Sequence, residues 1–202
     1  VLVEAEGMHM THPDASIRAK TQQYFRDLVQ FCQDLGGKSI VVGSPHQRNL
    51  ESGVTLDQAT EWATEVFRPA VQDGEDKGVT ICFEPLAPSE TNFINTAEEA
   101  IQFTRRIPSP AFKIILDVKA MCSMGKPIAD IIRESWPAFA YFHANDANLK
   151  GPGFGDVDFV PIASALKEVG YQGYVSVEVF KFEEGPEVIA RQSLDYLKKT
   201  FA

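Results

Sequence analysis

The sequence is poor in cysteine and contains no long apolar run. Its three cysteines, Cys32, Cys82 and Cys122, lie far apart without a CxxC pair, which excludes a disulfide framework and indicates reduced thiols. No run approaches the roughly 18 apolar residues that a membrane span needs. Residues 1–6 lack the basic and apolar regions of a secretory signal. We therefore expect a cytoplasmic protein without a membrane partner.

Basic residues are scarce relative to acidic ones. The chain has 19 Lys and Arg against 28 Asp and Glu, which gives a formal net charge of −9. A nucleic-acid surface needs a basic stripe to meet phosphates. We therefore expect no nucleic-acid partner, although a local basic pocket for a small anion stays compatible with this charge.

What the sequence does contain is a strand followed by a helix, repeated. Short apolar runs predict parallel strands, and residues 1–10 are expected to hold the end of a further one. Helical periodicity predicts helices between the strands, with Gly and Pro at their ends. This alternation predicts an α/β fold of the (β/α) type. The strands are expected at 38–42, 79–83, 112–116, 139–142 and 174–177, and the main helices at 11–35, 55–72, 95–107, 127–134, 158–169 and 187–200.

Four of these strands are followed by a residue that can bind a metal or move a proton: Glu84, Asp117, His143 and Glu178. They are 33, 26 and 35 residues apart, close to one strand–helix unit each time. The C-terminal ends of barrel strands share one face, and these oxygen and nitrogen ligands suit one divalent cation. Taken singly, each residue also fits a structural role, as a paired or capping carboxylate or a core histidine. The ordered set favours a shared site.

Two carboxylates beside one substrate can move a proton on carbon. Glu84 and Glu178 are the candidate acid and base, one removing the proton and the other returning it. A metal would polarise the carbonyl and hydroxyl oxygens of the substrate and stabilise an enediolate. This chemistry describes aldose–ketose isomerisation or epimerisation.

Three further residues are candidates for substrate contact. Glu90 lies six residues after Glu84, and His46 follows the strand at 38–42. Lys150 precedes the glycine-rich segment 151–156, which is interpreted either as a substrate-covering loop or as a long turn. An equally open interpretation is that the Lys150 side chain is solvated and contacts no substrate. No sequence motif assigns a chemical role to His46.

Four motifs together resemble the xylose-isomerase-like TIM-barrel superfamily, and within it the sugar phosphate isomerase/epimerase group. The resemblance implies a single barrel domain over residues 1–202 and a small carbohydrate substrate. It implies one divalent metal ion (Mn, Mg, Co or Zn) on Glu84, Asp117, His143 and Glu178, with the two Glu residues as the acid–base pair and Glu90 as a substrate contact. The motifs are Phe-Glu-Pro-Leu, Ile-Leu-Asp, Phe-His-Ala-Asn-Asp with Gly-Pro-Gly-Phe-Gly-Asp-Val-Asp-Phe, and Val-Ser-Val-Glu-Val.

The sequence departs from this pattern in two ways. The epimerase pattern has a His three residues after the metal-binding Asp, where this chain has Ala120. The superfamily barrel has eight strand–helix units, whereas about six are counted here and the N-terminal ones are missing. We therefore expect an incomplete TIM-type barrel whose open edge is covered in a homo-oligomer.

Two alternative functions stay open beside the isomerase/epimerase. One is a lyase similar to inosose dehydratases, and the other is a catalytically inert, metal-binding barrel fragment. A DNA-repair endonuclease of the related fold is not expected, because its zinc site needs more than the four His present and the net charge has the wrong sign.

Overall fold

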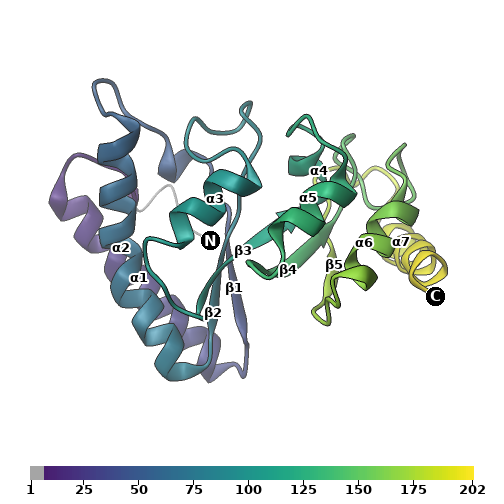
Figure 1. The fold of residues 1–202 in the computed structure, drawn as a ribbon, viewed down its shortest axis with the longest axis horizontal. Helices are drawn as coiled ribbons and strands as arrows, with labels where there is room; N and C mark the ends of the chain where they lie inside the picture. Colours follow the sequence, from purple (N-terminus) through teal and green to yellow (C-terminus); the bar gives the residue numbers. More distant parts are fainter. Residues whose placement is uncertain (1–6) are drawn as a thin grey trace. The chain divides into compact units, whose positions relative to one another are not determined.

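The computed structural model describes residues 7–202. The chain packs as two compact units, one ending at Ile114 and the other running from Ile115 to Ala202. The boundary between the units falls within β3 (Phe112–Asp117). Figure 1 labels the helices and strands. The hydrogen-bonded strand order is β1-β2-β3-β4-β5. The described residues therefore hold five strands in chain order. The further strand expected within residues 1–10 falls mainly on residues 1–6, outside the described part, and residues 7–10 form turn and irregular structure.

The first unit alternates helices with parallel strands, as predicted. Val42 of β1 lies opposite Phe83 of β2, and Phe83 lies opposite Ile114 of β3. The predicted strands and helices are confirmed to within a few residues, except at the end of α2. The elements are α1 (Ala15–Asp34), β1 (Ser39–Val42), the short 3₁₀ helix η2 (His46–Arg48), α2 (Leu56–Lys77), β2 (Thr80–Phe83) and α3 (Ala97–Thr104).

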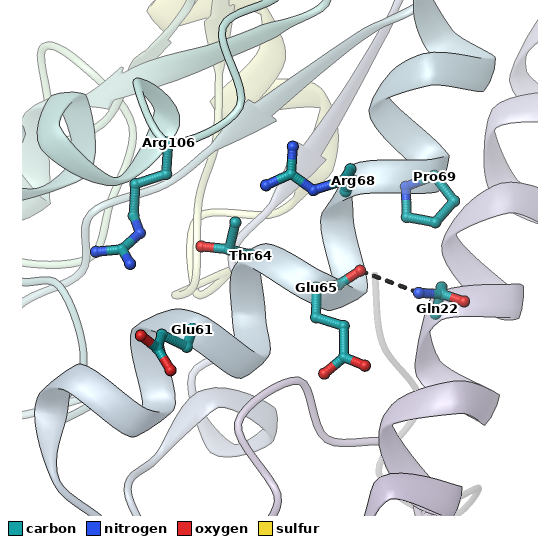
Figure 2. Close-up of a pocket in the computed structure, with 7 residues that line it drawn as sticks. All are labelled: Gln22, Glu61, Thr64, Glu65, Arg68, Pro69 and Arg106. Atoms are coloured by element: carbon teal, nitrogen blue, oxygen red, sulfur yellow. Dashed lines mark hydrogen bonds between the residues drawn. The ribbon is translucent and has the colours of Figure 1, made fainter.

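Helix α2 runs past Gln72, the last residue that is helical by pattern. Its end was predicted between Asp73-Gly74 and Gly78, and it lies at the second of these, because the C-cap Gly78 has a left-handed φ of 66°. A Cβ on Gly74 would lie 2.5 Å from the Val79 carbonyl oxygen, so glycine is needed there for close approach rather than for a turn. Pro69 within α2 cannot donate to the Glu65 carbonyl, and Gln22 of α1 donates to that oxygen at 3.0 Å (Figure 2).

Five phenylalanine rings form the centre of the first unit. The Phe67 ring of α2 lies 4.7–5.9 Å from four other rings, measured between centroids. These rings come from three helices and two strands, so their burial holds the helices onto the sheet. The four neighbours are Phe25, Phe83, Phe103 and Phe112.

The second unit continues the pattern after β3. Strands β4 and β5 are parallel, with His143 opposite Ser176. Helix α4 was not predicted, because four residues are too few to show helical periodicity. No helix among residues 7–202 has the length and hydropathy that a membrane span needs. The elements are α4 (Val118–Met121), α5 (Ile128–Ser135), β4 (Phe139–Ala144), α6 (Phe159–Glu168), β5 (Val175–Val177) and α7 (Pro186–Phe201).

Candidate metal centre

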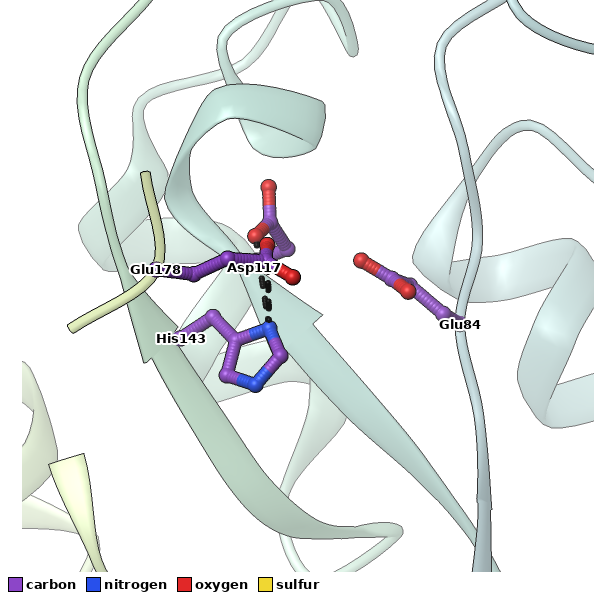
Figure 3. A group of neighbouring side chains, drawn as sticks. All are labelled: Glu84, Asp117, His143 and Glu178. Carbon is purple, nitrogen blue, oxygen red and sulfur yellow. Dashed lines mark ion pairs between the residues drawn. The ribbon is translucent and has the colours of Figure 1, made fainter. Parts of the chain in front are cut away.

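The second unit brings three of the predicted ligands together. Asp117 is the last residue of β3, His143 lies in β4 and Glu178 follows β5. His143 Nδ1 lies 3.3 Å from Glu178 Oε2 and 3.7 Å from Asp117 Oδ2. One possible ligand atom from each residue lies within 4.8 Å of the other two (Figure 3). Three adjacent parallel strands therefore deliver these donors to one place.

Asp117 is both a helix cap and a member of this cluster. Its Oδ1 accepts from the Ala120 N–H at 2.8 Å, which caps α4. Burial opposes ionisation of Asp117, but hydrogen bonds from His143, Ala120 and Asn145 bring the pKa of its carboxyl below the usual value. Asp117 is therefore a charged carboxylate at neutral pH, as a metal ligand must be.

Asn145 belongs to the cluster and was not among the predicted site residues. Its side chain is fully buried. Its Nδ2 donates to Asp117 Oδ2 at 2.6 Å and to Glu178 Oε2 at 3.3 Å. The signal that could have identified it is its spacing, because residues two apart along an extended chain face the same side, and Asn145 follows His143 by two.

Glu84 lies in the first unit, directly after β2, and is buried. Its carbonyl oxygen accepts from Arg48 Nη1 at 2.7 Å, and the Arg48 guanidinium lies 4.6 Å from the centroid of the Phe83 ring. Burial lowers the pKa of Arg48 to about 10, against the charges of Glu84 and Glu90, so Arg48 keeps its charge at neutral pH. Arg48 thus fixes the backbone that presents Glu84, a role the sequence did not reveal.

The three candidate substrate contacts lie in different settings. His46 is exposed in η2. Glu90 is half-buried, and its Oε2 accepts from the Ala87 N–H at 3.3 Å. Lys150 forms an ion pair with Glu184 and lies 3.8 Å from Glu183 Oε2, which links the loop after β4 to the loop after β5. A role in substrate binding stays a prediction for all three residues.

The glycine-rich loop after β4 folds around Asp146. The Asp146 carboxylate accepts from the Val157 N–H at 3.0 Å and from the Asn148 N–H at 3.3 Å. A Cβ on Gly155 would overlap that carboxylate. The glycine therefore allows the loop to close over Asp146, next to the buried Asn145.

The donor set fits a divalent cation. Carboxylate oxygens and an imidazole nitrogen are ligands that Mn²⁺, Mg²⁺, Co²⁺ and Zn²⁺ accept, and the set does not select among them. Within the second unit, the Asp117 and Glu178 carboxylates lie beside the His143 ring, so a cation bound there would meet two oxygen donors and one nitrogen donor.

A separate hollow lies on the outer side of the first unit, along α1 and α2 (Figure 2). Its volume is about 470 Å³, and none of the predicted site residues lines it. Its charged side chains are exposed and do not lie at a strand end; three belong to α2, and Arg106 lies in the turn after α3. The lining residues are Gln22, Glu61, Thr64, Glu65, Arg68, Pro69 and Arg106.

Comparison with known proteins gives one consistent result. The model of the family described as "Xylose isomerase-like TIM barrel" matches residues 2–200. D-psicose 3-epimerase of Ruminiclostridium cellulolyticum is 28% identical over 174 residues, which are 85% of this chain and 59% of that protein. L-ribulose 3-epimerase of Methylomonas sp. is 30% identical over 174 residues, 86% of this chain and 61% of that protein. The chain thus spans less than two thirds of these relatives.

Solved structures share the fold. D-psicose 3-epimerase from Clostridium cellulolyticum H10, solved with D-tagatose, has a TM-score of 0.85 at 23% identity and covers 95% of this chain and 73% of its own. The apo form of 3-keto-D-glucoside 4-epimerase from E. coli has a TM-score of 0.87 at 23% identity, over 95% of this chain and 75% of its own. The predicted α/β TIM-type fold is therefore confirmed.

Proposed function

We propose, from the premise that this chain belongs to the xylose isomerase-like TIM barrel family, that it is a divalent-metal-dependent isomerase or epimerase of a ketose sugar or sugar phosphate. The observation that carries the proposal is the convergence of Asp117, His143 and Glu178, with one possible ligand atom from each within 4.8 Å of the others. Two carboxylates and one imidazole gathered in one place are a donor set that divalent cations accept.

Glu84 is the fourth ligand in this proposal. Phe83 pairs with Ile114 in the parallel ladder of β2 and β3, so Glu84 leaves β2 at the same C-terminal side at which β3 ends. Arg48 holds the Glu84 carbonyl, and Gly43 gives the Glu84 carboxylate room, because a Cβ on Gly43 would lie 2.6 Å from Oε2. The hydrogen bond from Arg48 and the space beside Gly43 therefore fix the position of the buried Glu84 carboxylate at the end of β2.

Glu84 and Glu178 would transfer the proton. The Glu178 side chain is one-third exposed, so a substrate can reach it. The Asp117 side chain is fully buried, so it would bind the metal ion without contacting the substrate. One Glu removes a proton from the carbon beside the carbonyl, and the other returns a proton to the same or the neighbouring carbon. A bound divalent ion would supply Lewis-acid polarisation of the substrate oxygens.

The relatives suggest the carbon at which the reaction takes place. Several carry the name 3-epimerase, with psicose, ribulose or fructoselysine as the named sugar. We propose epimerisation of a ketose at C3 as the form to test first. Ala120, which is buried, stands where the epimerase pattern has a His, so any polar contact made by that His must come from another residue in this chain.

Deuterium exchange tests this proposal directly. The purified chain is incubated in D₂O with Mn²⁺ and a panel of D-psicose, D-fructose, D-tagatose and L-ribulose, and NMR follows the carbon-bound protons. The proposal predicts deuterium at C3 with formation of the epimer, and none after chelation of the metal. Loss of water from the substrate would indicate a lyase instead, and metal binding without exchange would indicate an inert fragment.

The matched variants are Glu178→Gln and Glu61→Gln. Glu178→Gln keeps the size of the side chain but removes the base, so exchange should fall by about 100-fold or more. Glu61 is an exposed residue of the outer hollow, and its variant should exchange like the parent chain. Equal exchange by the Glu178 variant and the parent would refute the role of Glu178.

A further inference from the structure

Asn145 lies at the end of the central strand of three that carry the candidate ligands. It directly follows β4, and β4 pairs with β5. From this position its side chain reaches Asp117 at the end of β3 and Glu178 after β5. One buried amide therefore connects both carboxylates of the second unit.

The orientation of this amide follows from its third contact. Asn145 Oδ1 lies 2.7 Å from the Lys119 backbone nitrogen, which can only donate. Lys119 is in the first turn of α4, where backbone N–H groups lack partners within the helix. The oxygen of the amide therefore faces Lys119, and its NH₂ group faces the carboxylates. The two N–H donors of that group match the two carboxylate acceptors.

We propose that Asn145 is a positioning residue that holds Asp117 and Glu178 in the arrangement required for a divalent cation. The inference rests on the proposed function, since it concerns the same metal centre. Asn145 carries no charge, so it orients both carboxylates while leaving their negative charge for the cation. Partners that orient metal ligands through hydrogen bonds contribute strongly to metal affinity.

Two variants at position 145 separate positioning from simple filling of space. Asn145→Asp keeps the shape and the acceptor for Lys119, but it turns a donor into a third negative oxygen that faces Asp117 and Glu178. Asn145→Ala removes the whole amide. Asn145→Ala should raise the Kd for Mn²⁺ by about 10- to 100-fold, because both carboxylates lose the donor that orients them. Both variants should change the visible absorption spectrum of the Co²⁺-loaded protein, which reports coordination geometry.

Asn95 provides the matched control. It is a half-buried amide of the first unit whose Nδ2 donates to the Leu86 and Thr91 carbonyl oxygens at 2.8 and 2.9 Å. Asn95→Asp should therefore lower stability without changing the Kd or the Co²⁺ spectrum. A Kd in Asn145→Ala that equals or is tighter than that of the parent, or a Co²⁺ spectrum that neither Asn145 variant changes, would overturn the inference.

A measurement on the unaltered chain covers the case in which neither variant folds. The side-chain NH₂ resonances of Asn145 should shift during titration with Mg²⁺ and saturate together with those of the site, while those of Asn95 stay fixed. If the parent chain binds neither Mn²⁺ nor Mg²⁺, the proposed metal centre fails and this inference fails with it. If the parent binds metal but the Asn145 resonances do not move, this inference alone fails.

Discussion

Single residues at the candidate site also have structural roles. Asp117 caps α4 through Oδ1 while Oδ2 faces His143 and Asn145. Arg48 is fully buried and fixes the Glu84 carbonyl rather than a carboxylate. A structural role was the alternative interpretation of Asp117 from sequence. The cap on α4 shows that role, and the role as a metal ligand stays a prediction.

A prediction at the scale of the residue concerns Gly43→Ala. Gly43 does not need glycine for a left-handed backbone, but an added Cβ would lie 2.6 Å from Glu84 Oε2. The flexible carboxylate would move aside at little cost in stability. We expect weaker Mn²⁺ binding and slower deuterium exchange, with an unchanged midpoint of urea unfolding.

Gly53→Ala is the reciprocal control. Gly53 has a φ of 85° and open space around its Cβ position, so alanine should cost about 1 kcal/mol of stability through backbone strain. It should leave metal binding intact. If Gly43→Ala bound Mn²⁺ like the parent, the proposed ligand role of Glu84 would lose its support.

At the scale of the element, strands deliver the ligands and caps fix the helices that follow them. Helix α2 begins with a capping box, in which Thr55 Oγ1 accepts from the Gln58 N–H at 3.2 Å and Gln58 Oε1 accepts from the Thr55 N–H at 3.0 Å. This helix carries Phe67 into the aromatic core. Its first turn therefore supports the packing of the first unit.

We predict that Thr55→Ala lowers the free energy of unfolding by about 1 kcal/mol, because the Gln58 N–H loses its acceptor. Urea unfolding followed by circular dichroism measures this change. Thr60→Ala in the same helix is the control. The Thr60 hydroxyl donates to the Leu56 carbonyl oxygen at 2.7 Å, and alanine has the higher helix propensity. Equal losses in both variants would argue against the capping role.

Sequence reasoning predicted most elements, because Gly, Pro and short apolar runs mark their ends. It failed where contacts between distant residues decide the structure. Gly74 resembled a helix end but allows the close approach of Val79. Asn145 was not among the predicted site residues, and its partners Asp117 and Glu178 are 28 and 33 residues away. The pairing of Lys150 with Glu184 could not be read from the motif either, and a substrate contact by Lys150 stays a prediction.

At the scale of the whole molecule, the second unit contains most of the candidate site. Asp117, His143, Asn145 and Glu178 all lie in residues 115–202, and Glu84 lies in the other unit. The family barrel is represented by five described strands, and the chain spans 59% and 61% of two curated relatives. A single barrel domain over 1–202 and a homo-oligomer that covers the open edge stay predictions.

Equilibrium binding of Mn²⁺ to the metal-free chain tests the central claim most directly. We predict saturable binding of a single ion per chain, with affinity reduced in Asp117→Asn and Glu178→Gln by at least about 100-fold, because each removes a charged ligand. Glu61→Gln, which changes an exposed carboxylate away from the strand ends, should bind like the parent. Absence of saturable binding, or equal affinity in all of these variants, would contradict the metal centre.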